Sequence, residues 1–179
     1  MYQLSLNGGW RLFGSPEQNG KLEEFKANAV EVGATVPGNV ELDFMRAGRL
    51  PQDLLTGDKI LMLQNYENWN FLYEREFTAE PGKPCELIFE GVDCFASYYL
   101  NGEKIGESEN MFIEHKFNVT GKLKQTNVLQ VALRSPVVEA MKKEYYPIPL
   151  RGWGQEQNFD QLYVRKAPHS YGDVYKRQG

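Results

Sequence analysis

A predicted β-hairpin constrains the fold of this chain more than any other feature of its sequence. Between Leu87 and Ile113 the residues are typical of a strand, a bend and two further strands joined by Asn101-Gly102. Asn-Gly is the dipeptide that most readily adopts the two positive-φ positions of a tight type I′ turn. The segment therefore predicts antiparallel β-structure in the middle of the chain.

Alternation with a period of two residues extends this prediction to other segments. Residues 128–134 alternate in this way, and a second predicted strand carries Tyr73, Arg75 and Phe77 on one face and Glu74, Glu76 and Thr78 on the other. Such alternation is typical of antiparallel strands with one buried face. Asn-Gly, Pro-Gly and Thr-Gly pairs separate the segments at short intervals, which favours a sandwich or barrel over a βαβ fold.

One or two short helices are expected to interrupt the strands. Asn39 and Ser135 can each cap a helix N-terminus with a side-chain oxygen. The first helix would end at Gly48, with an inner stripe of Val40, Phe44 and Ala47. The second would run toward Tyr145, and residues 50–65 and 146–158 are predicted to be loops.

Length and charge limit the classes of function. A chain of 179 residues fits one domain. Its net charge of −4 argues against a nucleic-acid partner, because a concentrated basic face supplies most of such affinity. No apolar run approaches the roughly 20 residues of a membrane span. The start of the chain shows no secretory signal, so we expect a cytoplasmic protein.

The two cysteines and the aromatic residues are less informative. Cys85 and Cys94 are expected to be free thiols, and no residue set has the spacing of a metal site, so no metal or cofactor is predicted. Ten Tyr, ten Phe and three Trp suit β-strands, and they also suit sugar binding, in which rings stack on apolar sugar faces. Strand packing is the commoner cause of such an excess.

Several motifs, in order along the chain, resemble one known family. They are Leu6–Trp10, Val36–Val40, Tyr66–Phe77, Phe89–Asp93, Leu100–Gly102, Glu109–Phe112 and Leu162–Gly172. Together they resemble the N-terminal galactose-binding-like domain of family 2 glycoside hydrolases, and most closely that of the β-mannosidase group. Glu74 stands where the family more usually has a basic residue.

The resemblance implies a jelly-roll β-sandwich packed against a (β/α)8 barrel that holds two catalytic glutamates of a retaining mechanism. A barrel needs about 250 residues and cannot lie in this chain. The chain also lacks the Asn-Glu dipeptide of the family's acid/base residue. We therefore expect a truncated, non-catalytic domain, inactive alone, that braces the barrel and edges its entrance. The alternative is a stand-alone carbohydrate-binding module in which Trp69, Trp153 and Tyr171 stack on sugar.

Five residues are candidates for the substrate edge or the domain interface. The resemblance places Arg165 and Lys166 at the seam between sandwich and barrel, although a solvated basic pair is an equally good interpretation. The other three candidates are His169, Tyr171 and Trp153. No catalytic residue is assigned: Glu156 and Asp160 lie in a predicted loop where carboxylates are usually solvated, and nothing there would raise the pKa of either.

The predicted domain covers residues 1–172. After Gly172 the family pattern expects Trp and Asp, but the chain continues with Asp-Val-Tyr-Lys-Arg-Gln-Gly. The hexapeptide Asp-Val-Tyr-Lys-Arg-Gln within it matches the translated end of a transposon adapter used in DNA sequencing. We therefore expect residues 173–179 to be a non-native tail, and Asp173 is not counted as a site residue.

Overall fold

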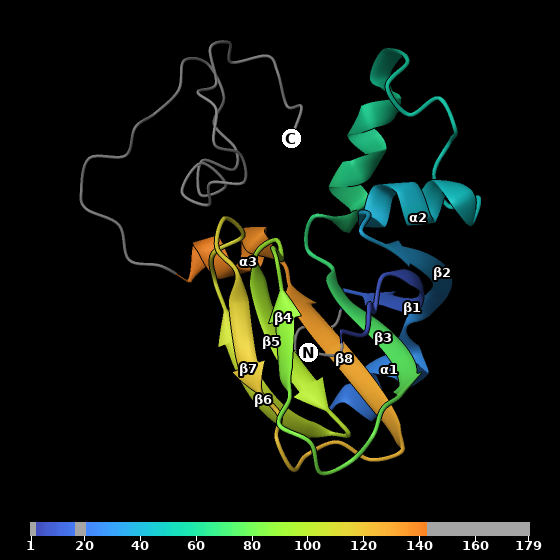
Figure 1. The fold of residues 1–179 in the computed structure, drawn as a ribbon. Coiled ribbons are helices and arrows are strands. Elements are labelled where there is room, and N and C mark those ends of the chain that lie inside the picture. The colour runs from blue at the N-terminus through green and yellow to red at the C-terminus, as the bar shows by residue number, and fades with distance from the viewer. Residues whose placement is uncertain (1–2, 17–20, 143–179) are drawn as a thin grey trace.

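The computed structural model describes residues 3–16 and 21–142, which form two antiparallel sheets packed face to face (Figure 1). The larger sheet has six strands in the order β2-β1-β3-β8-β5-β6, and the smaller sheet pairs β4 with β7. The strands are β1 (Gly8–Ser15), β2 (Val30–Val36), β3 (Asn70–Thr78), β4 (Glu86–Phe89), β5 (Phe95–Leu100), β6 (Glu103–Ser108), β7 (His115–Asn118) and β8 (Thr126–Arg134). The predicted all-β sandwich is confirmed.

The main core lies between the two sheets. The larger sheet contributes Leu12, Tyr98 and Leu129, all of which are almost fully buried. Phe89 and Phe117 of the smaller sheet close over Tyr98, with ring centroids 4.3 and 4.8 Å away. These three rings lie between the packed sheets, where flat side chains fill the space well.

The outer face of the larger sheet has its own small core. Helix α1 (Leu22–Asn28) lies across this face and buries Phe25 against Phe13 of β1 and Leu72 of β3. Because α1 covers the sheet here, both faces of β3 are covered. Leu72 points into the outer core, and its neighbour Tyr73 points into the inner core. The alternation along β3 is confirmed, but the expectation of a single buried face is wrong at this point.

The predicted hairpin is confirmed in detail. Asn101 and Gly102 join β5 to β6 with φ values of 54° and 83°, the two positive values that a type I′ turn requires. The Asn101 side chain also ties the turn to the neighbouring strand: its Oδ1 accepts a 3.0 Å hydrogen bond from the Val128 backbone N–H. The turn is thus anchored to β8 as well as closed on itself.

Helix α2 (Val40–Arg46) begins where the sequence predicted. Asn39 Oδ1 accepts a 2.9 Å hydrogen bond from the Leu42 N–H, and Gly48 follows the helix with φ 70°. The predicted inner stripe is only partly correct: Phe44 is 1% exposed, but Ala47 lies on the surface. Asp43 is buried instead, because the helix turns this residue toward β2.

The predicted loop over residues 50–65 is wrong in its second half. Residues Gly57–Tyr66 form a 3-10 helix, η1. Its apolar residues are consecutive from Ile60 to Leu63, so no helical period marks the segment in the sequence. With α1, which was also not expected, the described residues contain three short α-helices and one 3-10 helix.

Helix α3 (Pro136–Met141) follows the last strand. Ser135 Oγ accepts a 3.2 Å hydrogen bond from the Val138 N–H and Pro136 occupies the first turn, as predicted. The expected continuation toward Tyr145 lies outside the described residues, as does the predicted loop over residues 146–158. None of the helices in the described ranges has both the length and the apolar character needed to cross a membrane.

Candidate functional site

The five predicted site residues, Arg165, Lys166, His169, Tyr171 and Trp153, lie outside the described residues. One aromatic residue proposed for sugar stacking can be placed. Trp69 packs edge-on against Tyr66, with ring centroids 4.9 Å apart, and against Phe44 at 6.4 Å. It is therefore half-buried and packs against the main core beside Phe44 of α2.

Glu74, the residue that departs from the family pattern, is the centre of a buried charged cluster. Its carboxylate accepts hydrogen bonds from Lys26 Nζ at 2.7 Å, from Gln130 Nε2 at 2.8 Å and from Arg11 Nη1 at 3.0 Å. Lys26 comes from α1, Arg11 from β1 and Gln130 from β8. The cluster therefore fixes α1 on the outer face of the sheet, and its two cations balance the buried charge.

Asp43 is a second buried carboxylate, and its neighbours are also structural. It forms an ion pair with Arg46 and accepts a 3.1 Å hydrogen bond from the Thr35 N–H. The Tyr73 hydroxyl lies 3.5 Å from its other oxygen. Burial, followed by the negative charge of Asp43, raises the pKa of Tyr73 well above the ordinary range of a phenol. Tyr73 is thus held neutral in the fold.

Histidine and cysteine side chains form no metal centre in the part of the chain that the structure describes. His115 Nε2 donates a 2.9 Å hydrogen bond to the Asn110 carbonyl, so this histidine closes the connection between β6 and β7. Cys94 is buried and Cys85 is half-buried, and neither forms a disulfide in the described structure. His115 therefore holds a loop, and the two cysteines are at least partly buried in the sandwich.

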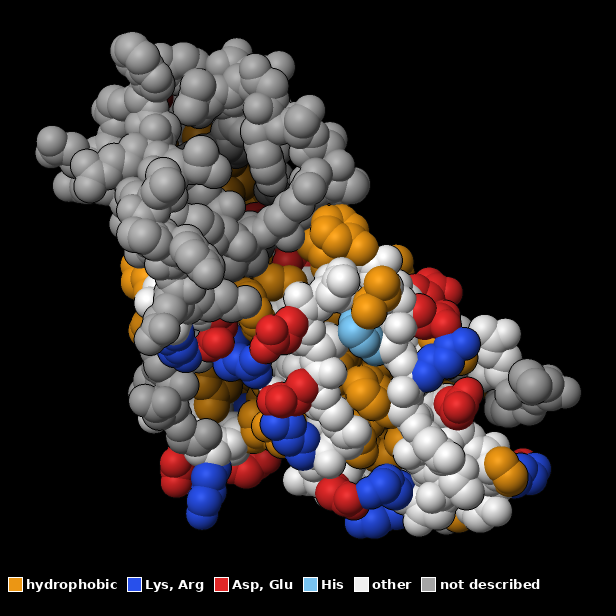
Figure 2. Space-filling model, turned by 90° about the vertical axis from the view of Figure 1, so that its left-hand side faces the viewer, with side chains coloured by type: hydrophobic (Ala, Val, Ile, Leu, Met, Phe, Trp, Pro, Cys, Tyr) orange, Lys and Arg blue, Asp and Glu red, His pale blue; other side chains and the backbone are white. Residues whose placement is uncertain are grey.

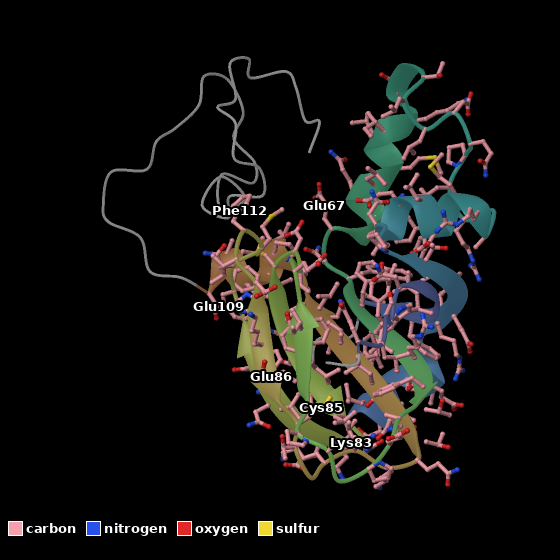
Figure 3. The ribbon with its side chains drawn as sticks, viewed as in Figure 1. Glu67, Lys83, Cys85, Glu86, Glu109 and Phe112 are labelled. Carbon is pink, nitrogen blue, oxygen red and sulfur yellow. The ribbon has the colours of Figure 1, made fainter. Side chains whose placement is uncertain are left out.

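One end of the sandwich differs from the other in the character of its surface. The connections that follow β2, β4, β6 and β8 lie at the end that carries α2, η1 and α3, which is uppermost in Figure 1. Figure 3 shows Phe112 and Glu67 toward this end, whereas Lys83, Cys85 and Glu86 lie toward the opposite end. We call the first end the helical end of the sandwich.

Exposed apolar side chains gather at the helical end. Phe112, Ile113 and Met141 are 49%, 51% and 53% exposed. Figure 2 shows hydrophobic side chains beside the single described histidine, His115, on this part of the surface. Asn110 Oδ1 accepts a 2.9 Å hydrogen bond from the Phe112 N–H, and this Asx turn fixes the loop that carries the phenylalanine. In the sequence, Asn110 and Phe112 stand out only as part of a family motif, although an Asn two residues before the Phe is a signal for an Asx turn.

A family model described as "Glycosyl hydrolase 2 galactose-binding domain-like" matches residues 17–173. The β-mannosidase B of Thermothelomyces thermophilus is 34% identical over 76% of this chain, which is 16% of its own length. The β-mannosidase of Mus musculus is 31% identical over 98% of this chain and 20% of its own length. The chain thus spans about a fifth of the length of these relatives.

Solved structures give the same result. The β-D-mannosidase of Dictyoglomus thermophilum superimposes with a TM-score of 0.75 and 33% identity, over 96% of this chain and 20% of its own. A β-glucuronidase of Ruminococcus gnavus superimposes with a TM-score of 0.52 over 74% of this chain at 21% identity, and this match concerns the fold alone. The similarity to the mannosidase therefore covers nearly all of the present chain.

Proposed function

The chain belongs to the galactose-binding-like domain family of glycoside hydrolase family 2, and from this membership we propose that it is the non-catalytic N-terminal domain of a retaining β-mannosidase. In that enzyme it braces the catalytic barrel and edges its entrance. The observation that carries the proposal is the similarity of almost the whole chain to one fifth of the Dictyoglomus enzyme. Residues 1–172 constitute the domain.

The buried carboxylates support a non-catalytic role. A glycosidase needs two carboxyl groups that share a site, one of which has a raised pKa and acts as the general acid. In the described residues the two buried carboxylates, Asp43 and Glu74, each pair with cations. They lie on opposite sides of the larger sheet, since Glu74 of β3 lies beneath α1 and Asp43 of α2 contacts Tyr73 of the inner core. The two carboxylates therefore do not share one site.

The five candidate residues stay part of the proposal. We place Arg165, Lys166, His169, Tyr171 and Trp153 at the seam with the barrel, where they support the substrate edge or the interface. Residues 173–179 are proposed to be a non-native tail. Sequencing the source DNA with a different adapter tests the tail: recovery of Asp-Val-Tyr-Lys-Arg-Gln after Gly172 contradicts it.

A stand-alone carbohydrate-binding module is the second candidate function. The aromatic content of the chain favours it, but Trp69, one of its three stacking residues, is half-buried and packs against the core. Carbohydrate would then be a direct partner of the isolated chain and not a substrate of the complete enzyme.

Calorimetry and an activity assay on residues 1–179 distinguish the two. We expect no hydrolysis of p-nitrophenyl β-D-mannopyranoside and no heat of binding with β-mannosides or β-galactosides at millimolar concentration. Binding in the micromolar range would support the module and contradict the proposal of a supporting domain.

A further inference from the structure

Three Asn-Gly pairs occur in the chain, at residues 7–8, 19–20 and 101–102. In this dipeptide the backbone nitrogen of the glycine can attack the side-chain amide carbon of the asparagine, because glycine has no side chain to hinder the approach. Each pair is therefore a candidate site of spontaneous deamidation. The pair at 19–20 lies outside the described residues, and the other two have different surroundings.

The Asn101 side-chain amide is bound at both of its polar atoms. Its Nδ2 donates hydrogen bonds to Oδ1 of Asn127, at 3.0 Å, and to the Lys122 carbonyl, at 3.2 Å. Its Oδ1 accepts a 3.0 Å hydrogen bond from the Val128 N–H. The backbone N–H of Asn101 donates to the Val128 carbonyl at 2.8 Å. The amide is thus held against β8 and the connection that precedes this strand.

Asn127, the side-chain partner of this amide, is itself fixed. It is buried, its Oδ1 also accepts a 2.8 Å hydrogen bond from the Lys124 N–H, and its Nδ2 donates a 2.7 Å hydrogen bond to the Lys124 carbonyl. On the other side of the turn, Glu103 forms an ion pair with Lys122. The β5–β6 turn and the connection before β8 therefore hold each other in place.

Asn7 is the contrasting case. It lies in the exposed N-terminal arm, and its side-chain amide makes no hydrogen bond to another described residue. Its backbone carbonyl accepts a 2.9 Å hydrogen bond from Arg75 Nη1, so the contact restrains the main chain and not the amide. The two Asn-Gly pairs give a comparison within one chain, because the dipeptide is the same and the restraint on the amide differs.

We propose that Asn101 is a deamidation site that the native fold protects and that unfolding of the hairpin exposes to reaction. In the reaction the Gly102 nitrogen attacks Cγ of Asn101, the Cγ–Nδ2 bond breaks, and ammonia leaves with the amide proton, so that a five-membered succinimide forms. Water, the only co-reactant, then opens the ring to aspartate or isoaspartate. In the fold, the amide must first release its three side-chain hydrogen bonds before Cγ can turn onto the nitrogen.

Either product disfavours the native turn. An aspartate at this position has no amide N–H, so its second oxygen faces two acceptors, the Lys122 carbonyl and Oδ1 of Asn127. An isoaspartate adds a methylene group to the main chain within a two-residue turn whose length sets the register of β5 and β6. Deamidation of Asn101 in the unfolded chain therefore prevents the return to the native fold, whereas deamidation of Asn7 leaves the sandwich intact. This inference does not rest on the proposed function.

Peptide mapping by mass spectrometry tests the protection. The 179-residue chain is incubated at mildly alkaline pH, folded and in concentrated guanidinium chloride, and the deamidation rates of Asn7 and Asn101 are compared. In the folded chain we expect Asn101 to react at least about tenfold more slowly than Asn7, because its hydrogen bonds must break first. In denaturant the two rates should converge. Equal rates in the folded chain would overturn the inference, and so would an Asn101 that stays slow in denaturant.

A substitution identifies the protecting contact. Asn127→Ala removes the acceptor of Asn101 Nδ2, so deamidation of Asn101 relative to Asn7 should accelerate in the folded variant. Asn118→Ala, an exposed position in β7, is the matched control and should leave the ratio unchanged. An unchanged ratio in folded Asn127→Ala would contradict protection by this contact.

A refolding experiment tests the consequence and needs no variant. The chain is held in denaturant until part of both asparagines has reacted, diluted into buffer, and separated by size exclusion into native and non-native fractions. We expect modified Asn101 to be enriched in the non-native fraction and modified Asn7 to be divided evenly between the two. A native fraction that contains modified Asn101 in the same proportion as the starting material would overturn the inference.

Discussion

At the scale of single residues, the most consequential side chain is Glu74. It lies in a strand that otherwise follows the family pattern, and three donors from three different elements converge on its carboxylate. A buried carboxylate is stable only when it is paired and fully hydrogen-bonded. Glu74 is therefore compatible with the fold because α1 brings Lys26 to it.

Replacement of Glu74 by glutamine tests this dependence. The amide keeps the shape but not the charge, so Lys26 and Arg11 lose their anionic partner, and we expect the free energy of unfolding to fall by about 2 kcal/mol. Urea denaturation measures the change. Glu76→Gln, on the exposed part of the same strand, is the matched control and should stay within about 0.5 kcal/mol of the wild type. An equal effect of both substitutions would contradict the assigned role.

Tyr73 gives a prediction for alkaline pH. Its pKa is raised in the fold above the ordinary value of 10.0, chiefly by burial. The folded state therefore keeps a proton that the unfolded chain loses above about pH 10. The associated stability is fully present below that pH and is lost as the pH rises further. Between pH 9 and pH 11.5, the free energy of unfolding should fall less steeply in Tyr73→Phe than in the wild type; parallel profiles would contradict this.

Gly106 shows a close approach that the sequence does not reveal. A Cβ atom at this position would lie 2.1 Å from Cε1 of Phe117, in the strand on the other sheet. Gly106→Ala should therefore cost about 1 to 3 kcal/mol of stability. Gly33→Ala is the control, since nothing lies within 4 Å of its Cβ. In the background of Phe117→Leu, Gly106→Ala should lower the free energy of unfolding by less than it does in the wild type. An equal loss in both backgrounds would show that the alanine does not clash with the Phe117 ring.

At the scale of elements, the sequence predicted the turns and helix starts that depend on residues a few positions apart. It did not predict the elements that depend on contacts between distant residues. Asn101-Gly102, Asn39 and Ser135 each act within a few residues, so the hairpin and two helix starts could be predicted. Helix α1 depends on Phe25 meeting Phe13 and Leu72, which are distant in sequence. Similarly, the Asp43 carboxylate of α2 is buried where it accepts a hydrogen bond from the Thr35 N–H of β2. Such pairings follow from the arrangement of the sheet and cannot be read from spacing.

The Asn39 cap offers a test at this scale. Asn39→Ala removes the acceptor for the Leu42 N–H, and loss of an N-cap usually costs about 1 kcal/mol. Because the lost hydrogen bond holds the first turn of α2, hydrogen exchange over residues 40–47 should accelerate more than exchange in β5 and β6. Uniform acceleration over the whole chain would show that the cap stabilises only the global fold.

At the scale of the whole molecule, the sandwich is an asymmetric body. Its two sheets bury a continuous core, one outer face is covered by α1, and its exposed apolar residues gather at the helical end. The family and the class of fold could be predicted from motif order along the chain. The position of the exposed surface could not, because exposure depends on which end of the sandwich each connection occupies. The predicted residues between Trp153 and Tyr171 lie outside the described part.

The most direct test of the central claim is β-mannosidase activity in a graft. The Dictyoglomus enzyme without its N-terminal fifth is assayed with p-nitrophenyl β-D-mannopyranoside, alone and with residues 1–172 of this chain joined in place of the missing part. A supporting domain that braces the barrel predicts little activity for the shortened enzyme, restored activity for the graft and none for the present chain by itself. A folded graft that is no more active than the shortened enzyme would contradict the account.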